Sequence, residues 1–342
     1  MTTFIKTYAA PAAGASLQPF EYDPGPLRPE QVEIAVSYCG ICHSDLSMLD
    51  NEWGQSVYPL VAGHEVVGTI TAVGEHVRKV GVGQLVGLGW LSGSCLYCHP
   101  CLSGDHNLCV RAESTIVQRH GGFAERVRCN WEWATPLPEK VDPATAGPLF
   151  CGGITVFNPL IQFGVKPTHR VGVIGIGGLG HMALQFLSKW GCEVYAFTSS
   201  ESKRAEALEL GAHDTVSSRA PESMKKIAGA LDFVLSTVNV PLDWQAIIDT
   251  LAPRGRLALV GAVLEPIPVA AFPIIMSQRS ISGSPLGSPA TTATMLEFCA
   301  RHGIAPVTEK FPMSQVNDAI EHLRSGKARY RVVLENDFAK RT

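Results

Sequence analysis

The sequence predicts an α/β protein with two domains, one irregular and mostly β, the other a doubly wound parallel sheet. The length of 342 residues suits about two domains of ~100–200 residues each. Short apolar runs broken by Gly and Pro fill the chain from Met1 to about Phe150, which is typical of short strands. From about Thr155 to Pro285, continuous apolar runs alternate with helical segments, as expected for a parallel sheet that helices cover on both faces.

The individual elements follow this division along the chain. In the first part we expect strands at QVEIAVSY, EVVGTITAVG and GQLVGLGW. In the second part, VGVIGIGG, EVYAFTSS, DFVLSTV and GRLALVGA are predicted strands, and HMALQFLSKWG and SKRAEALELGA are predicted helices. Beyond Pro285, TTATMLEFCARHG predicts a helix that ends at Gly303, and MSQVNDAIEHLRSG predicts one that Ser314 caps and Gly326 ends. RYRVVLE is a final predicted strand.

The segment after Pro285 is too short for a hydrophobic core of its own, at about 55 residues. We therefore expect it to complete the first domain. Residues 1–154 and 286–342 would then form one domain, and residues 155–285 the other.

Composition and charge exclude several classes of protein. With 46% hydrophobic and 17% charged residues, the chain is globular and not disordered. Lys and Arg number 28 against 31 Asp and Glu, so no basic excess favours nucleic acid as a partner. The sequence shows neither a secretory signal nor a run of about 20 apolar residues. We predict a cytoplasmic protein that binds neither nucleic acid nor membrane, and we expect the ten cysteines to serve metal or redox chemistry.

Four cysteines are closely spaced in one loop. Cys95, Cys98, Cys101 and Cys109 form C-x2-C-x2-C-x7-C among Ser, Gly, Pro and Asp residues. Four thiolates close a tetrahedral Zn²⁺ shell without an open position, which makes a structural site. An iron–sulfur cluster is the alternative. The spacing is stronger evidence for a metal than for its identity.

A second group of metal-ligating residues is dispersed along the chain. Cys42 lies in CGICHSD, His64 and Glu65 in AGHEVVG, and Cys151 in PLFCGG. One His and two Cys supply three ligands and leave a fourth position for water or substrate, as in a catalytic zinc site. Taken singly, a buried small apolar residue explains Cys151 and a structural hydrogen bond explains His64.

A glycine motif predicts a dinucleotide site. Gly175, Gly177, Gly178 and Gly180 follow the strand RVGVI and open the helix HMALQFLSKW. Glycines there permit a tight turn and let backbone N–H groups approach a pyrophosphate at the helix N-terminus.

The residues after the next strand indicate which cofactor binds. Ser199 stands where an NAD site places an acidic residue, and Ser200, Lys203 and Arg204 follow it. Hydroxyls and cations suit a 2′-phosphate, so we expect NADP(H). In the alternative, Glu201 reaches the ribose and NAD(H) binds.

These motifs together resemble the zinc-dependent medium-chain alcohol dehydrogenases, in the cinnamyl-alcohol-dehydrogenase-like branch. The resemblance covers nearly the whole chain and rests on CGICHSD, AGHEVVG, the four-cysteine loop, PLFCGGITVF, GIGGLGH and KARYRVVL. It implies a GroES-like catalytic domain, a Rossmann nucleotide-binding domain, two zinc ions per chain and a homodimer joined through the nucleotide-binding sheets.

The resemblance also implies a role for individual residues. Cys42, His64 and Cys151 would bind the catalytic zinc, which Glu65 can approach, while Cys39 is not a ligand. Asp45 would orient the His64 imidazole, and Ser44 would hydrogen-bond the substrate oxygen and relay its proton. The cofactor would lie along His43, Thr155, Leu179, Thr237, Gly261 and Ser284.

Three features depart from the family pattern. Ser47 stands where related enzymes often carry the histidine that ends the proton relay. The stretch from Val110 to His120 is short and lacks a tryptophan expected over the substrate, and Pro285 replaces an expected aromatic residue. Cinnamyl substrates are therefore not assumed.

The motifs predict an enzyme that interconverts aldehydes and primary alcohols with zinc and NADP(H). One alternative is a zinc-free quinone or enoyl reductase on the same fold. The other is a redox-sensing or structural zinc protein that binds nucleotide without turnover.

Overall fold

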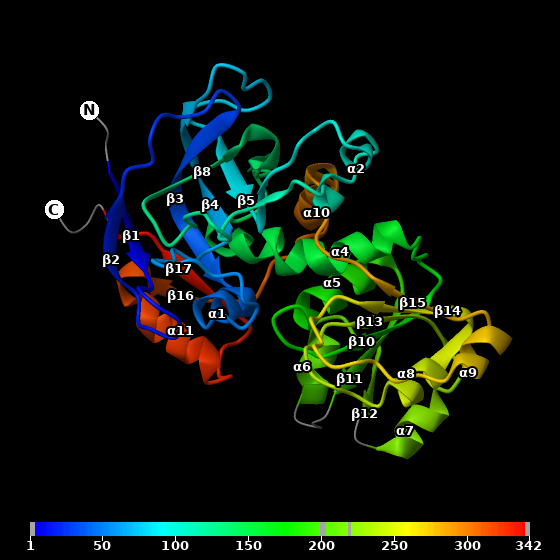
Figure 1. The fold of residues 1–342 in the computed structure, drawn as a ribbon. Helices are drawn as coiled ribbons and strands as arrows, with labels where there is room; N and C mark the ends of the chain where they lie inside the picture. The colour runs from blue at the N-terminus through cyan, green and yellow to red at the C-terminus, as the bar shows by residue number, and fades with distance from the viewer. Residues whose placement is uncertain (1–3, 199–202, 218–219, 339–342) are drawn as a thin grey trace. The chain divides into compact units, whose positions relative to one another are not determined.

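The computed structural model describes residues 4–198, 203–217 and 220–338. The chain divides into two compact units, Met1–Ile154 with Leu286–Thr342, and Thr155–Pro285 (Figure 1). The first unit is mostly β and the second contains a parallel sheet, so the predicted fold class is confirmed.

The first unit is built on a seven-stranded sheet. The strand order is β16-β17-β3-β4-β5-β9, and β8 pairs with β3. Two small antiparallel sheets, β1 with β2 and β6 with β7, complete its strands. Their bounds are β1 Ile5–Ala9, β2 Gln18–Tyr22, β3 Gln31–Ile41, β4 Glu65–Val73, β5 Leu85–Leu88, β6 Leu91–Gly93, β7 Glu113–Ser114, β8 Arg126–Asn130, β9 Thr135–Pro136, β16 Thr308–Pro312 and β17 Arg331–Glu335.

The end of the chain joins this sheet. β17 pairs antiparallel with β3, with Leu334 opposite Cys39, and its red ribbon lies beside the blue β3 in Figure 1. Buried side chains of both strands, including Ile34 and Val332, belong to one hydrophobic core. The strand predicted at RYRVVLE therefore forms, and it stabilises the strand that leads to Cys42.

Short helices connect and flank the strands of the first unit. They are α1 His43–Leu49, α2 His99–Leu102, α3 Pro143–Ala146, α10 Pro289–His302 and α11 Val316–Arg324, with 3-10 turns η1 His106–Leu108, η2 Trp131–Trp133, η3 Gly147–Phe150 and η5 Met313–Gln315. Helix α4, Gly152–Gln162, begins in the first unit and continues in the second.

The ends of the last two helices test the predicted caps. Helix α10 ends at Gly303 in the left-handed conformation, as predicted. The predicted cap of α11 is wrong, because Ser314 lies in the turn η5 and Gln315 is the N-cap residue. The Ser314 N–H instead donates to Asp337 Oδ1 at 3.0 Å, so a contact with the end of the chain decides where the helix starts.

The second unit is a six-stranded sheet in which every pairing is parallel. Its order is β12-β11-β10-β13-β14-β15, so the strand order reverses between β10 and β13. The strands are β10 Arg170–Ile174, β11 Glu193–Thr198, β12 Asp214–Ser217, β13 Leu231–Ser236, β14 Leu251–Leu259 and β15 Ser280–Gly283, and the helices are α5 Gly180–Trp190, α6 Arg204–Glu209, α7 Pro221–Lys226, α8 Trp244–Thr250 and α9 Ala271–Met276.

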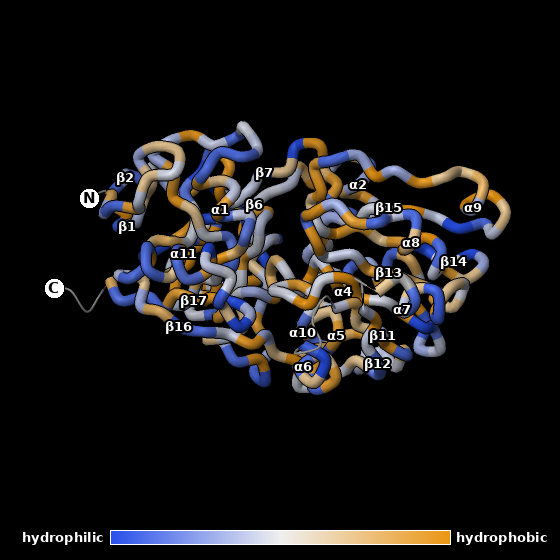
Figure 2. The backbone as a smooth tube through the Cα atoms, turned by 90° about the horizontal axis from the view of Figure 1, so that it is seen from below, coloured by the Kyte–Doolittle hydropathy of each residue, from blue (hydrophilic) through white to orange (hydrophobic). Residues whose placement is uncertain are grey.

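One edge of this sheet carries an exposed apolar surface. β15 is the last strand of the sheet, and α9 lies directly before it in the chain. The tube around α9 is largely in the hydrophobic colour range (Figure 2). Phe272, Ile275 and Met276 on this helix are between 67% and 70% exposed. Exposed apolar side chains that cluster in this way usually mark an interaction surface.

Within the described residues, no single helix is long and apolar enough to cross a membrane. The bent pair Pro143–Phe150 and Gly152–Gln162, whose axes meet at 55°, is long and apolar enough only when taken together.

Candidate functional site

The first unit gathers four potential metal ligands at one buried point. Cys42, His64, Glu65 and Cys151 each offer a ligand atom, and these atoms lie within 4.8 Å of one another. The Cys42 and Cys151 sulfurs are 3.8 Å apart, and His64 Nε2 lies 3.3 Å from the Cys151 sulfur. Cys42 caps α1, His64 directly precedes β4, and Cys151 joins η3 to α4. The fold thus brings together three segments that are far apart in the sequence.

Asp45 connects two of these segments through three hydrogen bonds. One carboxylate oxygen lies 2.9 Å from His64 Nδ1 and accepts from the Gly63 N–H at 2.8 Å. The other accepts from the Cys42 N–H at 2.8 Å. With Nδ1 held by a carboxylate, the His64 ring presents Nε2 to the cysteines, as metal-bound histidines do. Burial lowers the pKa of His64, but the Asp45 carboxylate outweighs it and raises this pKa well above its usual value.

Arg331 contacts the cluster and was not predicted from the sequence. It begins β17, and its Nη2 contacts Glu65 Oε1 although 266 residues separate them. Both side chains are buried. Burial raises the pKa of Glu65 to about 7, while the Arg331 guanidinium acts in the opposite direction. The available signal was the arginine that opens the apolar run in KARYRVVL, but nothing in the sequence paired it with Glu65.

An unsatisfied oxygen shows that the cluster fits a cation. Glu65 Oε2 is buried and has no hydrogen-bond partner among the described residues. A Cβ added at Gly40 would lie 2.1 Å from this oxygen, so the absence of a side chain at Gly40 makes room for it. Buried carboxylate oxygens need a donor or a cation. Zn²⁺ matches the cluster because Cys and His are its preferred ligands, and three of them leave a fourth position open.

The two cysteines of the cluster influence each other's pKa through their sulfurs, which lie 3.8 Å apart. Hydrogen bonding from Cys151 lowers the pKa of Cys42 well below its usual value. The same bond, with burial, raises the pKa of Cys151. The Cys42 thiolate therefore forms first. A bound cation would displace the second proton, because thiolates are the ligand form.

Helix α1 contains polar residues that lie at increasing distance from the cluster along the helix. The Ser44 hydroxyl lies 3.8 Å from the Cys42 sulfur. Ser47, one turn further, is buried and donates to Glu52 Oε2 at 2.7 Å. Glu52 is exposed, so the serine that replaces the family histidine reaches a surface carboxylate. His43, which the resemblance puts at the pyrophosphate, is exposed at the start of α1.

Two tryptophans beside the cluster were also missed. The Trp90 ring meets the His64 ring edge-on with centroids 4.9 Å apart, and Trp53 meets Trp90 in the same way at 5.8 Å. Neither lies in a motif, and their contacts join separate loops. The two tryptophans put large side chains beside the cluster. The missing tryptophan between Val110 and His120 and the proline at position 285 had indicated a site with fewer large side chains.

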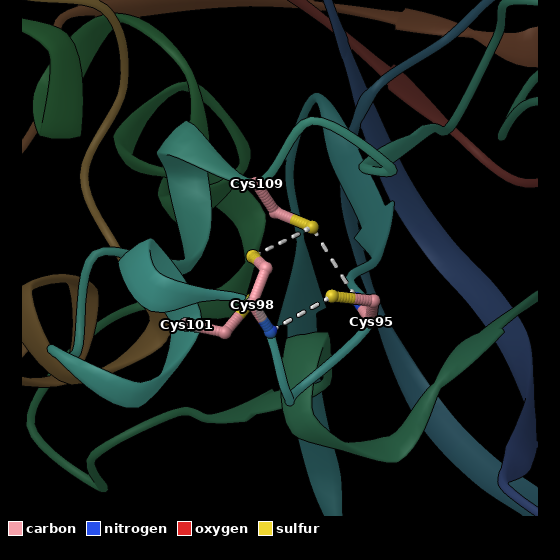
Figure 3. Close-up of side chains that lie close together, drawn as sticks. All are labelled: Cys95, Cys98, Cys101 and Cys109. Atoms are coloured by element: carbon pink, nitrogen blue, oxygen red, sulfur yellow. Dashed lines mark hydrogen bonds between the residues drawn. The ribbon is translucent and has the colours of Figure 1, made fainter.

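The four-cysteine loop forms a second cluster between β6 and β7. The sulfurs of Cys95, Cys98, Cys101 and Cys109 lie within 4.8 Å of one another (Figure 3). Backbone N–H groups of Cys98 and Cys95 donate to the Cys95 and Cys109 sulfurs at 3.3 and 3.4 Å, and Arg111 N–H donates to Cys109 at 3.4 Å. Amides that point at sulfur stabilise thiolates. Four such ligands close a tetrahedral metal shell.

The glycine motif lies where β10 ends, at the reversal of the strand order. Gly175 has φ +88°, and a Cβ there would lie 2.5 Å from Val238. A Cβ at Gly180 would lie 1.9 Å from the Gly175 carbonyl oxygen, whereas one at Gly177 would meet nothing within 4 Å. Gly178 and Leu179 connect the turn to α5. This geometry leaves an open backbone surface next to a helix N-terminus, which suits a pyrophosphate.

The remaining predicted cofactor residues belong to the second unit. Thr237 Oγ1 donates to the carbonyls of Ile174 and Gly175 at 2.9 and 2.8 Å. A Cβ at Gly261 would lie 2.0 Å from the Val238 carbonyl oxygen. Thr155 lies in α4, and buried Ser284 accepts from Asn158 Nδ2 at 2.9 Å. Ser284 is thus held in place by the helix that carries Thr155.

Only some of the residues predicted to bind the 2′-phosphate are described by the structure. Ser199, Ser200 and the alternative Glu201 lie outside the described residues. Lys203 is exposed at the N-terminus of α6. Arg204 donates to Thr215 Oγ1 at 2.8 Å and to Asp214 Oδ1 at 3.1 Å, so its guanidinium is already engaged with β12.

Comparison with known proteins agrees with this architecture. The alcohol dehydrogenase GroES-like domain family matches residues 28–139, and the zinc-binding dehydrogenase family matches residues 178–301. Aldehyde reductase AdhA of Synechocystis sp. is 60% identical and covers 97% of this chain and 99% of its own. The 8-hydroxygeraniol dehydrogenase of Catharanthus roseus is 39% identical, covering 96% and 94%.

Solved structures show the same fold along the whole chain. A cinnamyl alcohol dehydrogenase of Sorghum bicolor, SbCAD4, is 35% identical with a TM-score of 0.93, covering 97% of this chain and 98% of its own. The cinnamyl alcohol dehydrogenase of Helicobacter pylori, complexed with NADP(H), is 29% identical with a TM-score of 0.89, covering 98% and 99%. The chain belongs to the zinc-dependent medium-chain alcohol dehydrogenases, in the cinnamyl-alcohol-dehydrogenase-like branch that its motifs predicted.

Proposed function

We propose that this protein interconverts aldehydes and primary alcohols by hydride transfer with NADP(H) and zinc. The observation that carries the proposal is the buried group of Cys42, His64 and Cys151 with the unpartnered Glu65 oxygen beside it. A relative that is 60% identical along nearly the whole chain is named an aldehyde reductase. In this proposal the first unit is the catalytic domain and Thr155–Pro285 is the nucleotide-binding domain.

Cys42, His64 and Cys151 would hold the catalytic zinc, which polarises the substrate oxygen and favours the alkoxide. Asp45 keeps the His64 ring aimed at the two sulfurs, so the ligand geometry is set before substrate binds. Arg331 anchors Glu65 beside the cluster and opposes the rise in the pKa of Glu65 that burial causes. The nicotinamide C4 would give or take the hydride, and the protein needs no nucleophile.

The residues of α1 would move the hydroxyl proton. Ser44 is the hydroxyl next to the metal ligands and would exchange a proton with the substrate oxygen. Ser47 lies one turn further and donates to Glu52, which meets solvent. A hydroxyl can accept one proton while it gives up another, so Ser47 would hand a proton that reaches it to Glu52 without titrating itself.

We propose that Cys95, Cys98, Cys101 and Cys109 hold the structural zinc. Four cysteine ligands fill a tetrahedral shell and leave no position open for substrate. The family assignment favours zinc over the iron–sulfur alternative.

The second unit offers a site for the adenosine half of the cofactor. A cavity of about 370 Å³ lies between α7 and α8 and is lined by Ile174, Phe197, Met224, Leu242 and Ile247. Its apolar walls suit an adenine ring. Because Asp214 engages Arg204, we assign the 2′-phosphate mainly to Lys203 among the described residues.

The test of this function compares cofactors and counts metal. We expect aldehyde reduction to be faster with NADPH than with NADH, and about two zinc ions per chain. Lys203→Ala should raise KM for NADPH about tenfold, the loss of one charged hydrogen bond, while Lys189→Ala on α5 serves as the control.

Each alternative has its own outcome in these measurements. Equal rates or a preference for NADH would overturn the cofactor assignment. No zinc would favour the quinone or enoyl reductase, and about one zinc without turnover would favour the nucleotide-binding sensor.

We further propose a cytoplasmic homodimer in which the edge strand β15 and the apolar face of α9 meet their copies. An open edge strand beside exposed Phe272, Ile275 and Met276 supports this arrangement. Light scattering should then give a mass about twice the 36.7 kDa of one chain.

A further inference from the structure

The four-cysteine loop makes a polar contact outside its own cluster. Asn107, in the turn η1 two residues before Cys109, donates through Nδ2 to the Leu286 carbonyl oxygen at 2.9 Å. The two residues are 179 positions apart. The contact therefore ties the metal loop to the segment that leads into α10.

Leu286 belongs to the wall of a small cavity. This cavity of about 20 Å³ is lined by Trp90, Trp133, Phe150, Ile154, Leu286 and Gly287, among others. It is water-sized, so small displacements of the wall change what fits. Gly287 packs so closely that a Cβ there would lie 2.6 Å from Ile154 Cδ1.

Two residues of this wall lie next to the candidate catalytic cluster. The Trp90 ring lies 4.9 Å from the His64 ring, and Phe150 directly precedes Cys151. The cavity itself has room for about one water and none for a substrate. A shift of Leu286 or Gly287 would reach an aldehyde bound at the cluster through Trp90 and Phe150, which pack in the same wall.

A second link runs from the same loop to the same cavity. His106 Nδ1 lies 3.4 Å from Ser94 Oγ, which accepts from Trp133 Nε1 at 3.4 Å. Trp133 and Ser94 are buried, and Trp133 lines the cavity. Two neighbouring residues of one loop thus reach two different parts of the wall.

We expect the loop to need a bound metal for a stable shape. Leu102 and Leu108 are 75% and 48% exposed, so the loop buries little apolar surface of its own. Without a closed metal shell, few contacts would keep Asn107 and His106 in place.

We propose that the four-cysteine loop positions the wall beside the substrate site, with Asn107 as the positioning residue for Leu286 and His106 as the support of Trp133. The structural metal then acts on substrate fit as well as on stability. This inference rests on the proposed function, because it takes the buried cluster of Cys42, His64 and Cys151 as the place where the substrate binds.

The test removes the Asn107 link while keeping the metal loop. Asn107→Ala should raise KM for the aldehyde about fivefold, the loss of one neutral hydrogen bond, with kcat nearly unchanged and two zinc ions retained. Asn107→Asp, which turns a carboxylate toward the Leu286 carbonyl, should raise KM further. Leu102→Ala, on the exposed side of the loop, should leave KM unchanged.

Hydrogen exchange gives a readout that does not need turnover. Peptides covering residues 284–292 should exchange faster in both Asn107 variants than in the wild type, and peptides around Trp133 faster in His106→Phe. If the wild type lacks aldehyde reductase activity, the proposed function fails while exchange still tests the link. An active wild type with unchanged KM and exchange in both Asn107 variants would overturn this inference alone.

Discussion

The two cysteine clusters of the first unit differ in how the chain assembles them. Cys42, His64 and Cys151 come from three separate segments, and all are buried. Cys95, Cys98, Cys101 and Cys109 come from one loop, in which Cys95 and Cys98 are partly exposed. One cluster depends on the whole β domain, the other on local turns. The comparison shows that two sites with cysteine ligands can be held in place by very different parts of the fold.

The polar groups around the two sets of sulfurs also differ. Asp45 and Arg331 flank the buried cluster, and each is itself buried in an ionic contact. Backbone amides donate to the Cys95 and Cys109 sulfurs of the four-cysteine loop, and Cys95 and Cys98 are partly exposed. Breaking a charge pair between buried partners costs more free energy than breaking one that solvent screens.

The largest effect should follow from removing a ligand of the buried cluster. Cys151→Ala should lower kcat more than about 10³-fold, because the Lewis-acid contribution of several kcal/mol is lost. One zinc per chain should remain, in the four-cysteine loop. Steady-state kinetics and metal analysis check this outcome, and Cys299→Ala, a buried cysteine outside both clusters, is the control. An active Cys151→Ala variant would remove this residue from the site.

A smaller effect, on stability, should follow from breaking the buried ion pair. Arg331→Leu leaves the Glu65 carboxylate buried without its partner and should lower the free energy of unfolding by about 3–5 kcal/mol. Arg324→Leu breaks the exposed pair with Asp50 and should cost less than about 1 kcal/mol.

Chemical denaturation measures both variants. If Arg331→Leu does not fold, Arg331→Lys keeps the charge and should recover part of the stability. Equal losses for the two pairs would contradict the larger cost assigned to disturbing a charge that has a buried partner.

The smallest effect on chemistry should come from the four-cysteine loop. Cys98→Ser should release one zinc and lower the melting temperature, because closed metal sites contribute folding free energy. The hydride-transfer step should change less than about threefold, since no group of this loop touches the reacting atoms. Single-turnover kinetics separates this step from substrate binding. A loss of hydride transfer as large as that of Cys151→Ala would mean that the two clusters do not act separately.

Much of the fold follows from local patterns in the chain. Continuous apolar strands alternating with helices predicted the parallel sheet, and GIGGLGH placed its nucleotide turn at Gly175. The cysteine spacing predicted a local cluster, and the structure brings those sulfurs together. These features depend on neighbours in sequence, so periodicity and spacing carry them.

Other features depend on contacts between distant segments. The start of α11 moved from Ser314 to Gln315 because Asp337 binds the Ser314 N–H. Arg331, Trp53 and Trp90 were missed because their partners lie on other loops and strands. No local pattern marks such a residue.

The sequence alone determined the fold class, the family, the residue types of both clusters and the glycine turn. Each of these depends on short patterns of neighbouring residues. Only the tertiary structure decided that Arg331 contacts Glu65 and that Ser47 donates a hydrogen bond to Glu52. The same holds for the contacts of Arg204 with Asp214 and of Asn107 with Leu286. The physical reason is that a side chain's ionic and hydrogen-bonding partners are chosen by proximity in space, which strand pairing and burial establish after the local elements form.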